Sequence, residues 1–211
     1  MVAFTEEVAR KIALQERDPW IEVEHDLVCL QHTMVNVALF GPPNAGDRGW
    51  VLIDAGLRGS APRIFHAARR RFGEHARPSA IILTHGHFDH VGSLLHLAEF
   101  WDVPVYAHPL EMPYLTGRSA YPPPDPLVGG GAMSLLSPLY SRGPIDISAR
   151  LQPLPSNHCV PGMLGWQWIH TPGHTPGHVS LFRNRDRTLI AGDAFVTTKQ
   201  ESMIAALLQP E

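Results

Sequence analysis

Apolar positions in the first half of the chain alternate between two spacings, one typical of strands and one typical of helices. Residues 20–41 alternate apolar and polar side chains, which predicts two neighbouring strands. Further along, short apolar runs predict strands and amphipathic stretches predict helices. The strands are expected at 50–56, 79–85 and 103–108, and the helices at 60–73 and 91–101. Strands alternating with helices predict an α/β layered fold.

The second half follows a different pattern. Residues 117–150 are rich in proline and glycine and also carry apolar side chains, so a lid over a binding site and an unstructured insertion are equally favoured. Strands are then expected at 165–173, 178–184 and 187–193, and helices at the two ends of the chain, within 1–20 and at 199–209. The apolar stripe of the last helix needs a partner surface, which the chain's own core or the second subunit of a homodimer would supply.

Bulk composition narrows the class of protein. A chain of 211 residues with 44% apolar and 18% charged residues predicts a single globular domain over 1–211. The formal net charge of −3 provides no basic surface for nucleic acid or for a membrane. Two separated cysteines, Cys29 and Cys159, argue against a disulfide framework. No apolar run is long enough to span a bilayer and the N-terminus lacks a secretion signal, so we expect a cytoplasmic protein with a small-molecule substrate.

Histidines concentrate in the stretch LTHGHFDHVG, residues 83–92, directly after an apolar strand. His85 and His87 lie two residues apart, so in extended backbone both side chains point the same way and can bind one ion together. Asp89 and His90 would aim at a different point, such as a second ion. Imidazole and carboxylate groups together suit zinc, manganese or iron. This spacing therefore predicts a metal site.

Two later stretches complete the candidate site. HTPGHTPGH, residues 170–178, combines Pro-Gly turns with three histidines. His174 is the expected third ligand of the first ion, whereas His170 and His178 are expected to support the loop through hydrogen bonds. Asp193 ends another apolar strand, and its two oxygens could bridge two cations about 3.5–4 Å apart.

These motifs, THGHFDH, TPGHTPGH and AGD, in this order and preceded by LIDAG, resemble those of the metallo-β-lactamase fold superfamily. The resemblance implies an αββα sandwich with the metal site at one edge, between the two sheets. It also implies that Asp54 is a carboxylate that steadies the metal-binding loop from behind. At the matching positions, the implied metal ligands are His85, His87 and His174 for the first ion, Asp89 and His90 for the second, and Asp193 as the bridge.

The resemblance also implies a reaction. An aspartate at position 193, where cysteine-containing antibiotic hydrolases carry cysteine, is similar to the glyoxalase II, lactonase and phosphodiesterase branches. We therefore expect a hydrolase that uses hydroxide bound at a site of two zinc ions, with manganese or iron as alternatives. Asp89 is the candidate catalytic residue that orients the water and moves its proton. The expected substrate is a small ester, thioester or lactone.

One expected ligand is absent from the sequence. The family pattern places a further histidine downstream of the bridging aspartate, and residues 194–211 contain none. The C-terminal portion is therefore expected to be incomplete, or naturally short with a weaker second site, or completed by another subunit. Two alternative functions follow: an iron-dependent oxidoreductase similar to the sulfur dioxygenases, which use a single iron, and a truncated chain that binds metal without catalysis.

Overall fold

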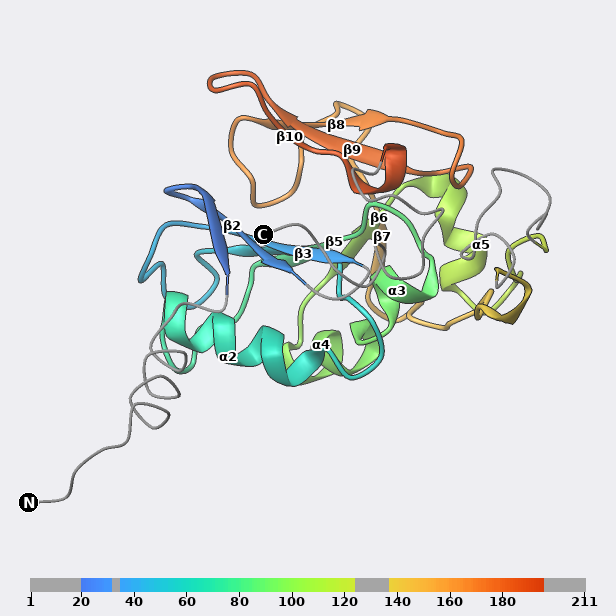
Figure 1. Cartoon of the computed structure of the whole chain (residues 1–211), viewed down its shortest axis with the longest axis horizontal. Helices are drawn as coiled ribbons and strands as arrows, with labels where there is room; N and C mark the ends of the chain where they lie inside the picture. Colours follow the sequence, from blue (N-terminus) through green and yellow to red (C-terminus); the bar gives the residue numbers. More distant parts are fainter. Residues whose placement is uncertain (1–19, 32–34, 124–136, 196–211) are drawn as a thin grey trace, which may run out of the picture.

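The larger of two β-sheets follows the order of the chain. A computed structural model describes residues 20–31, 35–123 and 137–195. Seven strands lie side by side in sequence order, antiparallel from β1 to β4 and parallel from β4 to β7 (Figure 1). They are β1 (Ile21–Glu24), β2 (Leu27–Gln31), β3 (Asn36–Phe40), β4 (Val51–Ile53), β5 (Ala80–Ile82), β6 (Val105–Ala107) and β7 (Leu151–Pro153).

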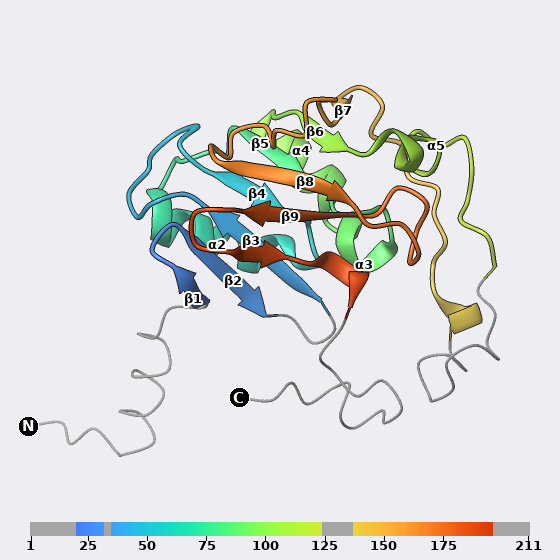
Figure 2. The same ribbon diagram turned by 90° about the horizontal axis from the view of Figure 1, so that it is seen from above.

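Helices cover one face of this sheet, and a second sheet covers the other (Figure 1). Helices α2 (Ala61–Phe72) and α4 (Leu94–Trp101) pack beneath the large sheet. The second sheet is antiparallel and has the order β10 (Thr188–Ile190), β9 (Val179–Arg183), β8 (Trp166–His170). Figure 2 shows this sheet lying across the large one. Short segments complete the described part: α3 (Phe88–Val91), η1 (Pro109–Glu111), α5 (Met112–Leu115), η2 (Ser137–Leu139) and η3 (Gly192–Ala194).

Strand β4 is buried on both faces, which explains its continuous apolar sequence. Leu52 belongs to the core between the sheet and the helices, and Val51 and Ile53 belong to the core between the two sheets. Successive side chains of a strand alternate between faces, so three apolar residues in a row join two cores. Within the described residues no helix covers the outer face of the small sheet, and its Ile169 and Leu189 are 43% and 44% exposed there.

The sequence-based expectations are confirmed for the helices α2 and α4 and for the strands β4 to β6 and β8 to β10, and are wrong in three places. Residues 20–41 form three strands instead of two, because a turn at His25 and Asp26 divides the first expected strand. Strand β7 was not expected, since its three residues include a proline. Residues 88–90 lie between the strand expected at 79–85 and the helix expected at 91–101, and with Val91 they form a separate helical turn, α3. The helices expected near the two termini, and residues 124–136 of the segment 117–150, lie outside the described residues.

Hydrogen bonds join the two sheets at both ends of β9. At its start, Val179 N donates to Thr84 O over 2.9 Å. At its end, the buried guanidinium of Arg183 donates to both oxygens of Asp26, at 2.8 and 2.7 Å. Thr84 follows the carboxyl end of β5, whereas Asp26 is level with the amino end of β4, so these contacts fix the second sheet at both ends of the large sheet. In the part of the chain that the structure describes, no helix is long and apolar enough to cross a membrane.

Candidate metal centre

The predicted site residues converge at one edge, where the two sheets meet. Asp54 follows β4, and the loop after β5 carries the first histidine motif. The β8–β9 loop carries His174, and η3 after β10 carries Asp193. The carboxyl ends of parallel strands share one edge of a sheet, so residues far apart in sequence are brought together there.

Three imidazoles form the first group. Side-chain nitrogens of His85, His87 and His174 all lie within 4.8 Å of one another. The nearest pair is His87 Nδ1 and His174 Nε2, 2.8 Å apart. His85 is buried, His87 is half-buried and His174 is exposed, so the group lies between the core and solvent.

A second group lies beside the first and shares His85 with it. Ligand atoms of His85, His90 and Asp193 also fall within 4.8 Å of one another. Asp89 lies nearby, with its Oδ2 3.8 Å from His90 Nε2. The helical turn α3 explains how the neighbouring residues Asp89 and His90 reach the same region.

The carboxylate of Asp193 stands between the two groups. Its Oδ1 is 3.4 Å from His90 Nε2, and its Oδ2 is 3.4 Å from His174 Nε2. Each oxygen therefore faces one group. This is the arrangement that a carboxylate bridging two ions requires.

Asp54 and Thr84 hold the histidines from behind. Asp54 Oδ2 lies 2.8 Å from His90 Nδ1 and accepts a hydrogen bond from Thr84 Oγ1, also at 2.8 Å. Thr84 N donates to Asp54 Oδ1 at 2.8 Å, and Thr84 Oγ1 lies 3.1 Å from His85 Nδ1. Both rings thus have Nδ1 engaged and Nε2 turned toward the cluster. Sequence reasoning identified Asp54 but missed Thr84, whose position directly before the first histidine was the available signal.

His178 and His170 support the site without joining either group. His178 is fully buried; its Nε2 accepts from Asp193 N at 2.9 Å, and its Nδ1 lies 2.8 Å from Thr171 Oγ1. His170 Nε2 lies 2.8 Å from Pro176 O and so holds the turn of its own loop. A Cβ on Gly192 would lie 2.6 Å from His178 Nε2, so this close approach requires glycine next to Asp193.

Most imidazoles of the site are held neutral. Burial and the neighbouring His174 and His90 imidazoles lower the pKa of His87 to about 3. Burial, followed by neighbouring imidazoles, likewise lowers the pKa of His85 and His178, and burial lowers that of His174. His90 is the exception: burial lowers its pKa, but the Asp54, Asp193 and Asp89 carboxylates outweigh burial and raise it well above the ordinary value.

These residues fit metal ions. Among the described residues, the buried Nε2 atoms of His85 and His90 have no hydrogen-bond partner. A buried polar nitrogen without a partner is costly, and such a cost is offset when the nitrogen binds a ligand. Neutral imidazole is also the form of histidine that binds metal. The cluster therefore presents the atoms that a cation needs: His85, His87 and His174 are neutral, and His90 would release its Nε2 proton when a cation binds.

Aromatic side chains around the site are engaged within the protein. Trp166 and Trp168 are buried in the core between the sheets, 1% and 7% exposed, and so form no wall of an open pocket. The hydroxyl of Tyr121 donates to Glu111 and is not free to bind a substrate oxyanion. Burial and the Glu111 carboxyl raise the pKa of Tyr121 well above its ordinary value, which keeps this donor protonated.

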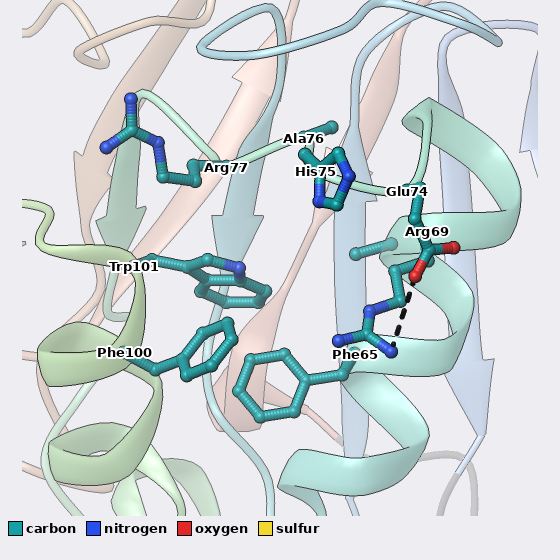
Figure 3. A pocket seen from close by; sticks show the side chains of 9 residues that line it. Phe65, Arg69, Glu74, His75, Ala76, Arg77, Phe100 and Trp101 are labelled. Carbon is teal, nitrogen blue, oxygen red and sulfur yellow. Dashed lines mark ion pairs between the residues drawn. The ribbon is translucent and has the colours of Figure 1, made fainter.

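Cavities adjoin the large sheet on both of its faces. One of about 300 Å³ lies between the sheets, with walls from β2, β3 and β10, and borders Asp54, His90 and Asp193. The other, of about 250 Å³, lies among α2, α4 and the residues leading into β5 (Figure 3). Its lining includes Phe65, Phe100 and the Arg69–Glu74 ion pair, and it lies at the opposite end of β5 from His85. Only the first cavity adjoins the histidine cluster.

Fold, motifs and comparisons together define the class of the protein. Residues 31–209 match the metallo-beta-lactamase superfamily, and the chain belongs to this family. Over 162 residues the chain is 53% identical to the probable metallo-hydrolase YflN of Bacillus subtilis (strain 168), a match that covers 77% of this chain and 61% of the relative. A second relative from the same organism, the probable metallo-hydrolase YybB, is 36% identical over 124 residues, which cover 59% of this chain and 49% of the relative. The chain therefore spans about half to three fifths of the length of these relatives.

Solved structures support the same fold. A B3 metallo-beta-lactamase with an active-site glutamic acid superposes with a TM-score of 0.59 at 23% identity, covering 86% of this chain and 64% of that one. TTHA1623, solved in a di-iron-bound form, superposes with a TM-score of 0.54 at 28% identity, covering 83% of this chain and 75% of that one. The αββα sandwich class expected from the sequence is confirmed.

Proposed function

We propose that this protein is a metal-dependent hydrolase with a site for two cations. The observation that carries the proposal is the position of Asp193, with one oxygen 3.4 Å from His90 Nε2 and the other 3.4 Å from His174 Nε2. The imidazoles of the first group are neutral, and His90 of the second group is paired with carboxylates. A carboxylate that lies between two such groups suits a pair of ions better than a single ion. Family membership supports hydrolysis as the reaction class.

Each ligand has a defined role in this proposal. His85, His87 and His174 would hold the first ion, and Asp89 and His90 would hold the second. Asp193 would bind both. Asp54 would fix His90 through the 2.8 Å contact at Nδ1, which leaves Nε2 directed at the ion. Such outer contacts set the orientation and basicity of a ligating imidazole.

The residues of this chain also account for proton movement. Bound ions would lower the pKa of a coordinated water and polarise the substrate's carbonyl oxygen. Asp89 is the catalytic residue that we propose to orient the attacking water and accept its proton at Oδ2, because this oxygen is 3.8 Å from His90 Nε2, beside the second group. Histidines 85, 87 and 174 serve as ligands and take no proton.

We propose a small ester, thioester or lactone as the substrate. An aspartate in the bridging position supports this class over antibiotic hydrolysis. Zinc is the proposed metal, with manganese or iron as alternatives, since a set of imidazoles and carboxylates suits all three. The di-iron-bound form of TTHA1623, 28% identical to this chain, makes iron the alternative to test first.

The test is turnover on a panel of esters, thioesters and lactones, with phosphodiesters alongside, before and after chelation and metal return. We expect hydrolysis that is lost when a chelator removes the metal and that returns when metal is added back. The His87→Ala variant should have no activity. His66→Ala, on the exposed face of α2, is the matched control and should keep full activity. Activity in His87→Ala equal to wild type would overturn the mechanism. Cleavage of phosphodiesters alone would show that the substrate is a phosphodiester and not a carboxylic ester, thioester or lactone.

A further inference from the structure

Glu111 is a completely buried acidic residue beside the metal centre. It ends the short helical segment η1, which follows β6, and His108 caps this segment by accepting from Leu110 N at 3.3 Å. Its exposed fraction is 0%. Glutamate is almost never fully buried unless it is paired or fully hydrogen-bonded, so the position needs an explanation.

Four donors surround its carboxyl group. Oε2 accepts from Gly86 N at 2.9 Å and from the hydroxyl of Tyr121. Oε1 accepts from Thr175 Oγ1 at 2.8 Å and from Gly177 N at 2.7 Å. Each oxygen thus accepts two hydrogen bonds, which is the capacity of a carboxylate. Hydrogen bonds within the protein therefore occupy both oxygens of Glu111, and neither oxygen is available to a metal or a substrate.

The donors belong to the two loops that carry the first histidine group. Gly86 lies between His85 and His87 in the loop after β5. Thr175 and Gly177 lie between His174 and His178 in the β8–β9 loop. One carboxyl group therefore connects two segments that are separated by about ninety residues of chain and that come from different sheets.

The close packing around this carboxyl group is a second, independent observation. A Cβ on Gly177 would lie 2.8 Å from Glu111 Cγ and 2.9 Å from Glu111 N. A Cβ on Gly86 would lie 2.6 Å from the hydroxyl oxygen of Tyr121. Neither glycine has a positive φ, so steric room and not backbone conformation accounts for glycine here. Both loops are shaped to approach Glu111.

We propose that Glu111 is a positioning residue that sets the spacing of His85 and His87 relative to His174, and so the affinity and geometry of the first metal ion. This inference rests on the proposed function, because it assigns these histidines to that ion. Glu111 acts through the backbone of the two loops. Glu111 thus acts on residues that bind metal without binding the metal itself. Mutation of such a residue typically lowers metal affinity about 10–100-fold.

Glu111→Gln tests the proposal with little change in volume. A glutamine has one accepting oxygen, and its amide nitrogen would face two of the four donors. Affinity for Zn²⁺ and Co²⁺ is measured by competition with a chromophoric chelator, and the visible absorption spectrum of the Co²⁺ form reports ligand geometry. We expect affinity for the first ion to fall about 10–100-fold and the Co²⁺ spectrum to change. Glu99→Gln, exposed on α4, is the matched control and should behave as wild type.

Melting temperatures with and without metal separate positioning from general stability. A residue that only stabilises the fold would lower both melting temperatures equally and leave affinity and spectrum unchanged; that result would overturn the inference. If Glu111 positions the ligands, adding metal should raise the melting temperature of the variant by less than it raises that of the wild-type chain. Tyr121→Phe and Thr175→Val each remove one donor and provide the same test in milder form if Glu111→Gln does not fold. Unchanged affinity in both milder variants would then overturn the inference, and a smaller loss than that expected for Glu111→Gln would support it.

The outcomes also distinguish this inference from the proposed function. A wild-type chain that binds no metal would overturn both. A wild-type chain that binds metal, together with a Glu111→Gln variant of equal affinity and identical Co²⁺ spectrum, would overturn the role of Glu111 and leave the metal centre standing.

Discussion

Replacing Asp54 with asparagine should weaken binding of the second cation while leaving the first. In the native arrangement Asp54 Oδ2 accepts from Thr84 Oγ1 and faces His90 Nδ1, both at 2.8 Å. When a cation is bound, Nδ1 of His90 would therefore keep the hydrogen that faces Asp54, and Nε2 would present its lone pair to the ion. An asparagine amide nitrogen in place of Oδ2 is a donor, so it favours the tautomer of His90 with hydrogen on Nε2. That tautomer cannot bind a cation through Nε2.

The magnitude follows from these contacts. Asp54 is 3% exposed, so water cannot replace the lost partners. A buried hydrogen bond to a charged group contributes about 1.5–3 kcal/mol. In its other tautomer His90 regains one hydrogen bond to the asparagine amide. The free energy of unfolding of the metal-free chain should therefore fall by about the contribution of one hydrogen bond to a charged group, about 1.5–3 kcal/mol. Affinity for the second ion should fall about 10–100-fold, equivalent to about 1.4–2.8 kcal/mol.

The assay is equilibrium dialysis followed by elemental analysis of Asp54→Asn across a range of metal concentrations, with urea denaturation of the metal-free chain. Asp47→Asn is the matched control, because Asp47 is about half exposed and pairs with Arg77 away from the site. Two ions bound to Asp54→Asn with wild-type affinities would show that Asp54 does not set the tautomer of His90, and the reasoning would be refuted.

Further predictions concern turnover, packing and pH. Asp89→Asn should keep the first ion and lose most of kcat at unchanged fold; wild-type kcat would remove Asp89 from the mechanism. Gly177→Ala should lower metal affinity and thermal stability together, since its Cβ would lie 2.8 Å from Glu111 Cγ, and an unchanged melting curve would contradict this packing. Arg183→Met should destabilise the chain by about 1.5–3 kcal/mol in chemical denaturation, because it removes the buried guanidinium that pairs with Asp26 and Asp186 and leaves Asp26 only the exposed Arg185; a change below about 1 kcal/mol would contradict this. The folded chain holds His87 neutral down to a pKa of about 3, while the unfolded chain protonates it below about 6.5. Metal-free stability should therefore fall as pH drops from about 6.5 toward 3, less steeply in His87→Gln, and equal slopes would refute the assignment.

The elements that the sequence predicts well are those with strong local signals. Helix α2 has a helix-compatible proline in its first turn and Gly73 after its end, and β5 is a short apolar run beside the first histidine motif. The division of residues 20–41 was missed because the turn at His25 and Asp26 carries no glycine or proline. Strand β7 was missed because it is three residues long and pairs with β6, which lies more than forty residues earlier.

The candidate site shows the same limit. The spacing of His85, His87, Asp89 and His90 predicts a metal site, and the resemblance to the metallo-β-lactamase fold superfamily implies that His174 and Asp193 complete it. Glu111 lies in the stretch HPLEMP, where nothing marks it as buried or as a partner of Gly86 and Gly177. Its contacts lie 25 and 66 residues away. They arise only when the β8–β9 loop folds over the end of β5, which is a tertiary event without a local signature.

Metal content per chain tests the central claim most directly. The chain would be purified without chelator, supplied separately with zinc, manganese and iron, freed of excess metal and analysed for bound metal, next to His85→Ala, because His85 would be a ligand of the first ion. We expect about two ions per wild-type chain and loss of the first ion in His85→Ala. One iron per chain with oxygen consumption would favour the oxidoreductase alternative, and no bound metal in the wild-type chain would contradict the account.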